Sequence, residues 1–296
     1  VLPRLPPSVL LAVLLVAACG EPAPRRPSAQ PQPAVAPVVP VGAGNIARCD
    51  GPNDEQTALL LDAIPGTVFT TGENVNTDGS PGEFRDCYGP SWGRHATRTR
   101  PAAGEVDYKT PGAAGYIDYF GAGAGDRALG YYSYDLGTWH IVVLNSNIGT
   151  AVGSAQEQWL RADLAATRQP CLLAYWDHPR FSSSGPPVRL EVRPFWDALY
   201  GAGADVVLNG HYRIYERFAP QTPAERADPE HGIRQFTVGT GGQGIDRIGT
   251  PRPNSEVRSS GVYGVLKLTL APDSYAWEFV PIAGQTFTDS GSMTCH

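Results

Sequence analysis

Polar side chains that could do chemistry stand directly after several apolar runs of this sequence. Asn45 follows "VGAG", Glu73 follows "TVFTTG", Asp177 follows "LLAYW" and His211 follows "VVLNG". Glu105, in the loop "RPAAGEVDY", adds another carboxylate. Ligands of α/β proteins gather at the carboxyl ends of the strands, so five groups placed alike favour one common site over unrelated surface residues. Carboxylates that converge there must be neutralised by a proton, a metal or another cation.

His211 is the member of this set that most suggests a metal site. The apolar strand Val206–Leu208 delivers this imidazole through Asn209 and Gly210. Two residues further on, where a second imidazole would complete a metal-binding pair, the chain has Arg213. A guanidinium stays protonated and cannot become a metal ligand. The stretch therefore allows two interpretations: a working metal site, or a former metal site that has lost a ligand.

The elements that would position these residues alternate along the first two-thirds of the chain. Strands that alternate with helices indicate an α/β core, and the strand-rich end from 235 to 280 suggests antiparallel pairs in a second sheet. The predicted strands are 41–47, 67–71, 131–136, 139–145, 172–176, 205–208, 235–238, 262–270 and 275–280, and the predicted helices are 54–64, 154–167 and 190–200.

The segments around these positions carry a family resemblance. They include "TPGAAGYIDYFG", "GYYSYDLGTWHIVVLNSN", "AYWDHPRFSS", "WDALYGAGADVVLNGH", "YERFAP" and "FTDSGSMTCH", in that order. From Val41 to His296 the chain resembles the calcineurin-like metallophosphoesterases, especially the bacterial branch that is similar to purple acid phosphatases. The resemblance implies an α/β fold, a two-sheet β-sandwich flanked by helices (αββα). In this family two metal ions roughly 3.5–4 Å apart activate water for attack on phosphorus.

The reactive positions depart from the family pattern although the text around them is kept. His211 alone is unchanged. Asn45 and Glu73 stand where the family has aspartates, Glu105 and Val106 where it has an Asn–His pair, and Asp177 and Arg213 where it has histidines.

These substitutions affect the two metal positions that the resemblance implies in different ways. One position would need Asn45, Glu73 and Arg213, and we expect its metal to be lost because arginine cannot be a ligand. The other position reads Glu73, Glu105, Asp177 and His211, which can all bind a cation. Three oxygen donors and one imidazole favour a single Mg, Mn or Ca ion over Zn or Fe.

A site without any metal is the alternative to this single ion. Arg213 would then take the place of the lost ion and pair with Glu73 or Asp177 through its two-pronged guanidinium. On this hypothesis, replacing Arg213 with histidine should raise metal uptake.

Val106 is the substitution with the largest expected effect on catalysis. The family histidine at this place assists the leaving group or the transition state, and valine has no proton to give. His178, next to Pro179, is interpreted as a packing or supporting residue. The glycine-rich stretch 239–244 lacks the Lys-Ser/Thr pair of a phosphate loop and is interpreted as a tight turn beside the site. We therefore expect a degenerate site, weakly active or non-catalytic, in a pseudo-phosphatase or binding module. The alternative is an active phosphoesterase with one unusual metal.

The first forty residues indicate export. A basic residue, Arg4, precedes an apolar run that is too short to span a membrane and that ends in Val16-Ala17-Ala18-Cys19. Residues 1–19 thus resemble a bacterial lipoprotein signal with lipid on Cys19; an ordinary secretory signal is the alternative. Residues 20–40 are rich in Pro and Ala and predict an extended tether, followed by one domain, 41–296. We expect an exported protein of the bacterial cell envelope, lipid-anchored or secreted.

The remaining cysteines and the charge limit the partners. Export permits disulfides, and four cysteines allow three pairings that the sequence leaves open. The net charge is -6 and no dense basic run occurs, which argues against a nucleic acid as partner. The expected partners are a membrane through Cys19, an unidentified ligand or protein, and a phosphoester substrate only if the site is active. The four cysteines are Cys49, Cys87, Cys171 and Cys295.

Overall fold

The computed structural model describes residues 1–2, 35–185 and 188–296, so the signal segment, Cys19 and most of the expected tether lie outside the described residues. The compact unit is Val35–His296, and it begins before the expected domain start at Val41. Val38 and Leu270 exchange two backbone hydrogen bonds of 2.9 and 2.8 Å, so the end of the expected tether already takes part in pairing. No helix in the described ranges is long and apolar enough to cross a lipid bilayer.

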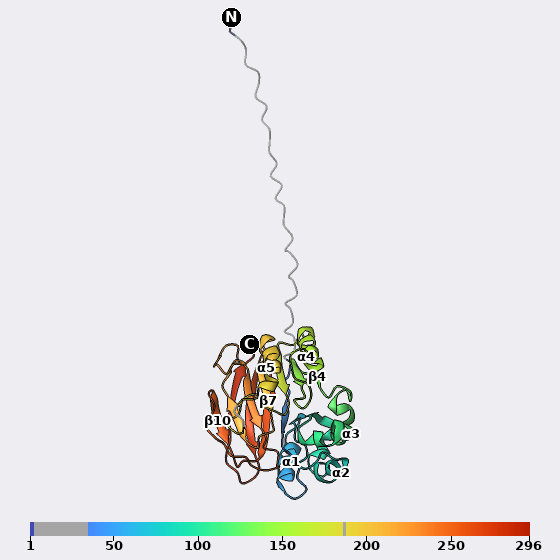
Figure 1. Cartoon of the computed structure of the whole chain (residues 1–296). Coiled ribbons are helices and arrows are strands. Elements are labelled where there is room, and N and C mark those ends of the chain that lie inside the picture. Colours follow the sequence, from blue (N-terminus) through green and yellow to red (C-terminus); the bar gives the residue numbers. More distant parts are fainter. Residues whose placement is uncertain (3–34, 186–187) are drawn as a thin grey trace, which may run out of the picture. The chain divides into compact units, whose positions relative to one another are not determined.

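Two β-sheets form the centre of this unit (Figure 1). The strands are β1 (Pro40–Ala43), β2 (Thr67–Thr71), β3 (Thr99–Ala102), β4 (Tyr132–Leu136), β5 (Trp139–Val143), β6 (Cys171–Tyr175), β7 (Val206–Asn209), β8 (Tyr215–Phe218), β9 (Arg234–Val238), β10 (Ser255–Ser259), β11 (Gly264–Leu270), β12 (Ser274–Pro281) and β13 (Ser290–Thr294). The first sheet has the order β13-β12-β11-β1-β2-β3 and the second has the order β10-β8-β9-β7-β6-β5-β4.

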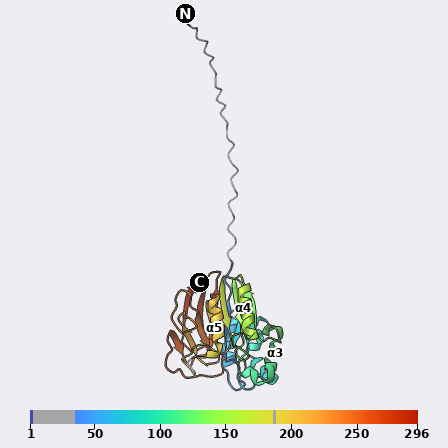
Figure 2. The ribbon, with the colours of Figure 1, turned by 45° about the horizontal axis from the view of Figure 1, so that its top comes forward.

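The described helices flank both sheets and leave the outer face of β11–β13 open. The helices are α1 (Asn53–Ala63), α2 (Pro81–Glu83), α3 (Ala114–Phe120), α4 (Ala155–Ala166) and α5 (Arg193–Gly201), with shorter helical turns η1 (Phe84–Tyr88), η2 (Trp92–Arg98), η3 (Val106–Lys109), η4 (Pro111–Ala113), η5 (Gly121–Ala124) and η6 (Leu190–Val192). Figures 1 and 2 show α4 and α5 side by side, and both helices pack on the second sheet. This arrangement confirms the predicted αββα class.

Strand β6 shows how the sequence builds these layers. All five of its residues are buried, which is typical of a central parallel strand with both faces covered. Leu172 and Ala174 join the apolar cluster under α4 and α5, whereas Leu173 and Tyr175 belong to the core between the sheets. The ring of Tyr175 packs 5.8 Å from that of Phe69 on β2, across the sandwich.

The strand-rich end of the chain differs from the expectation of a separate second sheet. Strands β11 and β12 are antiparallel as predicted, but β11 also pairs with β1 and so extends the first sheet. Strand β9 lies in the other sheet, between β7 and β8. Strands β3, β8, β10 and β13 were not predicted, because β3 contains Pro101 and the others carry charged or small polar residues that hide the apolar pattern.

The predicted helices form with small shifts at their ends. Ser154 caps α4 as expected, and its Oγ accepts the backbone N–H of Glu157. Helix α5 begins only at Arg193, after a separate turn, η6, because Pro194 is tolerated in a first turn and not further inside. The helical segment between residues 81 and 124 was missed, since glycine and proline interrupt its aromatic pattern.

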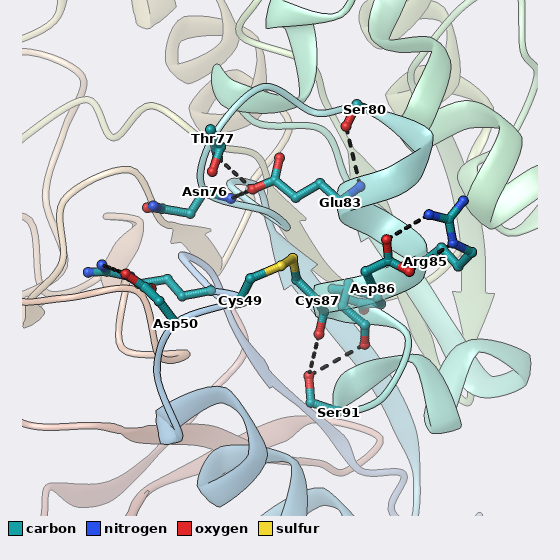
Figure 3. Close-up of a disulfide and its surroundings, with 12 residues drawn as sticks. Cys49, Asp50, Asn76, Thr77, Ser80, Glu83, Arg85, Asp86, Cys87 and Ser91 are labelled. Atoms are coloured by element: carbon teal, nitrogen blue, oxygen red, sulfur yellow. Dashed lines mark hydrogen bonds and ion pairs between the residues drawn. A yellow bond between two sulfur atoms is a disulfide. The ribbon is translucent and has the colours of Figure 1, made fainter.

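The four cysteines form two disulfides, Cys49–Cys87 and Cys171–Cys295, which confirms the prediction of disulfides and selects one of the three pairings. Cys171 opens β6 and Cys295 follows β13, so this bond joins the two sheets. Figure 3 shows the other bond, which ties the loop after β1 to η1. Disulfides of this kind persist in oxidising compartments.

A carboxylate beside the Cys49–Cys87 bond holds the loop that follows β2 (Figure 3). Glu83 accepts the backbone N–H groups of four successive residues, 76 to 79, at 2.6–3.1 Å. Such a cluster of amides is an anion-binding concavity, here occupied by the chain's own side chain.

His140 gives the second sheet a pH-dependent contact with α4. Its Nδ1 lies 2.8 Å from Asp135 and its Nε2 lies 2.9 Å from Asp163. Burial lowers the pKa of His140, but the hydrogen bonds and charges of the two aspartates outweigh burial and raise this pKa above its ordinary value. The charged imidazole therefore stabilises the folded state.

We expect the stability contributed by His140 to be lost at high pH. A raised folded-state pKa adds stability that is fully present below about pH 6.5 and disappears as the pH rises through the folded pKa. The difference in unfolding free energy between the protein and a His140→Gln variant, measured by urea titration, should shrink as the pH rises. The exposed His231→Gln change serves as a control, and a His140 difference that grows with pH would contradict the expectation.

Candidate metal and ligand site

Left-handed turns place three of the candidate residues at the strand ends. Asn45, Glu73 and His211 have φ angles of 55°, 53° and 64°, and they are half of the non-glycine residues with positive φ in the described ranges. Non-glycine residues rarely adopt this conformation, and when they do so they cluster at functional sites. Each turn therefore holds strain that the surrounding fold must support.

A glycine precedes four of the five candidates and lets their turns pack closely. A Cβ on Gly72 would lie 2.8 Å from the Cβ of Asp177, and a Cβ on Gly104 would lie 1.9 Å from the backbone nitrogen of Glu73. The Gly-X pattern at Gly44, Gly72, Gly104 and Gly210 is thus a sequence signal of converging loops.

The four residues predicted to hold a single metal meet around one atom. Nδ1 of His211 lies 3.6 Å from Asp177 Oδ2, 3.8 Å from Glu73 Oε1 and 3.9 Å from Glu105 Oε2. Asp177 and Glu73 are buried, and Glu105 is exposed. They form two overlapping groups rather than one shell: Glu73, Asp177 and His211, and Glu105, His178 and His211.

Backbone N–H groups already donate hydrogen bonds to two buried carboxylates, Glu73 and Asp177, which we call the inner carboxylates. The N–H of Glu105 donates to Glu73 Oε1 and to Asp177 Oδ2, both at 3.1 Å, and the N–H of Val106 donates to Glu73 Oε1 at 3.4 Å. Asp107, which is fully buried, braces this loop by accepting from the N–H of Gly104 at 2.7 Å. Burial raises the pKa of Asp107 well above its usual range.

His211 carries the positive charge nearest to the inner carboxylates. Burial lowers its pKa, but Asp177 and Glu73 outweigh burial and raise the pKa of His211 to about 9. Burial and the charge of Asp177 raise the pKa of Glu73. The protein's own charges thus neutralise one another in part at neutral pH.

Arg213 does not do what the sequence suggested. It pairs with Asp246, not with Glu73 or Asp177: its Nη2 lies 3.0 Å from Asp246 Oδ1, and its backbone N–H donates to Asp246 Oδ2 at 2.9 Å. The backbone contact fixes Asp246 beside Arg213, so the guanidinium satisfies this nearer carboxylate first. Asn45 turns its amide to the carbonyl of His211, at 3.2 Å.

Three residues of the site were not assigned to it from the sequence. His178 Nε2 lies 3.3 Å from Glu105 Oε2, and its ring centroid lies 4.2 Å from that of His211. Arg189 brings Nη2 to 3.0 Å from His211 Nε2. Gln243 lies in the glycine-rich turn, which the structure places beside the site as expected. The Gly-X pattern and the family pattern mark none of these three residues as part of the site.

A cavity of about 340 Å³ opens above these groups. Its wall combines acids with two cations, the exposed Lys109 and the half-buried Arg213, and with the side chains of Val106 and Tyr212. Glu73, Glu105, Asp246, Lys109, Arg213 and Val106 are among its lining residues.

The residues present do not fit a two-metal centre but can accept one cation. On one side, Arg213 is committed to Asp246 and Asn45 offers only an amide oxygen. On the other side, His211 Nδ1 and Asp177 Oδ1 are buried and have no hydrogen-bond partner within the described part of the chain. Such orphaned atoms beside carboxylates suit a bound cation.

Gln243 stabilises the strained turn of Glu73. Its side-chain amide donates hydrogen bonds to the backbone carbonyls of Glu73 and Val75, at 2.7 and 2.9 Å. We expect Gln243→Ala to lower the unfolding free energy by about 1–3 kcal/mol, since the Val75 carbonyl loses its donor and the Glu73 carbonyl keeps the N–H of Ile46 alone. Chemical denaturation measures this loss. The exposed Gln158→Ala change is the control and should stay within about 0.5 kcal/mol of the unchanged protein. Equal effects of the two changes would show that Gln243 does not brace the turn.

No family model matches the chain. Segments of it are similar to plant enzymes. Purple acid phosphatase 21 of Arabidopsis thaliana is 35% identical over 143 residues, which cover 44% of this chain and 32% of that protein. Purple acid phosphatase 18 of the same plant is 29% identical over 158 residues, which cover 49% of this chain and 35% of that protein. The chain therefore spans about a third of the length of these relatives.

Solved structures share the fold at low sequence identity. Purple acid phosphatase PPD1 from yellow lupin (Lupinus luteus) matches with a TM-score of 0.69 and 17% identity over 88% of this chain and 54% of that one. GAP50, described as the anchor in the inner membrane complex of Plasmodium, matches with a TM-score of 0.68 and 12% identity, over 88% of this chain and 90% of that one. PhoD matches with a TM-score of 0.62 and 12% identity, over 90% of this chain and 71% of that one. These matches show the fold.

Proposed function

We propose that this chain, which belongs to the calcineurin-like metallophosphoesterase family, keeps the scaffold of that family without its two-metal hydrolysis and serves as a binding or anchoring module of the bacterial cell envelope. The ion pair of Arg213 with Asp246 carries the proposal. It puts a neutralised guanidinium where the family pattern has the last metal-binding histidine.

Val106 supports the loss of catalysis independently of the metals. It lines the cavity at the place of the family histidine, and its methyl groups can neither donate a proton nor stabilise charge. General acid catalysis is typically worth about 10²–10⁴ in rate, so a bound ion alone would leave a slow enzyme.

The placement in the envelope rests on the sequence before Val35 and on the disulfides. The lipoprotein-like signal ending at Cys19 predicts a lipid anchor, and two disulfides suit an oxidising compartment. GAP50, which shares this fold, is described as an anchor, so the scaffold can serve a role of that kind.

One observation favours the alternative, a phosphoesterase with a single metal. Glu73, Asp177 and His211 offer ligand atoms within 4.8 Å of one another, and two of their buried atoms have no partner in the described residues. A metal held there could polarise a phosphoryl oxygen. Glu105 would be the fourth ligand that the sequence predicts.

The proposal is tested by turnover and metal content measured on the same purified protein. We expect no release of p-nitrophenol from p-nitrophenyl phosphate or its diester above the protein-free rate, with Mg, Mn, Ca, Fe or Zn present. Metal-dependent turnover that disappears in both Glu73→Ala and His211→Ala would establish the alternative instead.

A further inference from the structure

His178 and His211 form a pair of imidazoles of which the family pattern and the single-metal prediction use only His211. They follow two neighbouring parallel strands, β6 and β7, and their ring centroids are 4.2 Å apart. Glu105 completes a group of three, with Oε2 at 3.3 Å from His178 Nε2 and at 3.9 Å from His211 Nδ1. All three ligand atoms lie within 4.8 Å of one another.

We infer that Glu105, His178 and His211 form a zinc site beside the inner carboxylates, Glu73 and Asp177, with Glu105 and His211 also lining the cavity. The inference deepens the proposed function, on which it rests, because it names a ligand of the binding module. A tetrahedral zinc ion with bonds of about 2.0–2.2 Å spaces its ligand atoms about 3.3–3.6 Å apart. The observed 3.3 Å fits this spacing, and the exposed Glu105 side chain can close the longer distance.

The donor set selects zinc over magnesium, manganese or calcium. Two imidazoles and one carboxylate are typical zinc ligands, whereas the harder ions prefer oxygen. The sequence favoured those ions because it counted three oxygen donors and only one imidazole. Two of those oxygens, Glu73 Oε1 and Asp177 Oδ2, already accept the N–H of Glu105, while His178 adds a nitrogen.

Neighbouring side chains orient both imidazoles, with opposite consequences. Ser146 Oγ lies 2.9 Å from His178 Nδ1 and so directs Nε2 toward Glu105, as partners of metal-binding histidines commonly do. Arg189 holds its guanidinium 3.0 Å from His211 Nε2, so a fixed positive charge stands beside the ring that zinc would bind. This charge repels a second cation, so Arg189 weakens the site.

Calorimetric titration of the full protein with zinc chloride and, separately, magnesium chloride tests the inference. We expect one equivalent of zinc to bind, at least tenfold more tightly than magnesium. His178→Ala and Glu105→Gln should each weaken zinc binding by about tenfold or more, and Glu73→Gln, which removes a nearby charge and no zinc ligand, should weaken it by less than either. Glu105 is exposed, so its variant stays informative even if the His178 variant fails to fold.

Two further variants separate a built site from adventitious binding. The exposed His231→Ala change should not alter zinc binding, and Arg189→Met should tighten it by about fivefold, the net worth of a typical hydrogen bond. Cobalt as a stand-in for zinc should give the intense visible absorption of a four-coordinate ion. Absence of zinc binding, or binding lost in Glu73→Gln but kept in His178→Ala, would overturn the inference. Turnover in the same samples decides the proposed function separately.

Discussion

A variant that carries the family residues at the six altered positions is expected to bind two metal ions and to hydrolyse p-nitrophenyl phosphate at least about 10²-fold faster than the unchanged protein. The turns at Asn45, Glu73 and His211 already hold their left-handed conformations, so the new ligands would be aimed at a common point. Metal content and p-nitrophenol release measure the result. The changes are Asn45→Asp, Glu73→Asp, Glu105→Asn, Val106→His, Asp177→His and Arg213→His.

A five-residue variant that keeps Val106 is the matched control. It should bind the same two ions and remain slower by about 10²–10⁴, the usual contribution of a general acid. If the full variant bound both metals without gaining activity, loss of the ligands would not explain loss of catalysis. Metal-dependent activity of the unchanged protein as high as that expected of the full variant would contradict the proposed function itself.

Removal of the Cys171–Cys295 disulfide is expected to cost about 5 kcal/mol of unfolding free energy in the chain-entropy view of cross-links. The bond closes a loop of 124 residues and joins the two sheets of the sandwich. Guanidinium unfolding of the Cys171→Ser/Cys295→Ser protein measures the loss. A change of less than about 1 kcal/mol would show that the unfolded chain is held together in another way.

The second disulfide supplies the comparison for this result. Cys49–Cys87 closes a loop of 38 residues, for which the same relation gives about 4 kcal/mol. We therefore expect the inter-sheet bond to contribute more than the loop bond. The reverse order would mean that local packing around η1 outweighs the length of the loop.

The positions of the chemical groups could be predicted because they follow buried strands. Central parallel strands such as β6 are continuous apolar runs, and their carboxyl ends meet at one edge of the sheet. Edge strands such as β13 escaped prediction, since a strand exposed to water and paired on one side needs no apolar pattern. Strand β8 was missed for a different reason: it is buried and paired on both sides, but Glu216 and Arg217 interrupt its apolar pattern, and Arg217 forms ion pairs with Glu256 and Asp289.

The partners of the charged groups could not be read from the sequence. Asp246, which takes the charge of Arg213, comes 33 residues later in a stretch without periodicity. His178 was set aside because the family pattern assigns its neighbour, Asp177, as the ligand. The chain turns after β6 so that both side chains reach the site, with Asp177 Oδ2 and His178 Nδ1 3.6 Å apart. Such pairings depend on tertiary structure and not on local spacing.

The place of β1 in the first sheet has a mechanical consequence. The N-terminal segment leads into this strand, the candidate site begins at its other end with Asn45, and β11 and β2 pair with it on both sides. A force between a membrane tether and a ligand held at the site would act along the length of β1. Its hydrogen bonds to both neighbours would then resist together in shear instead of opening one after another. In the proposed membrane-anchored protein, β1 would therefore transmit force between the anchor and the site.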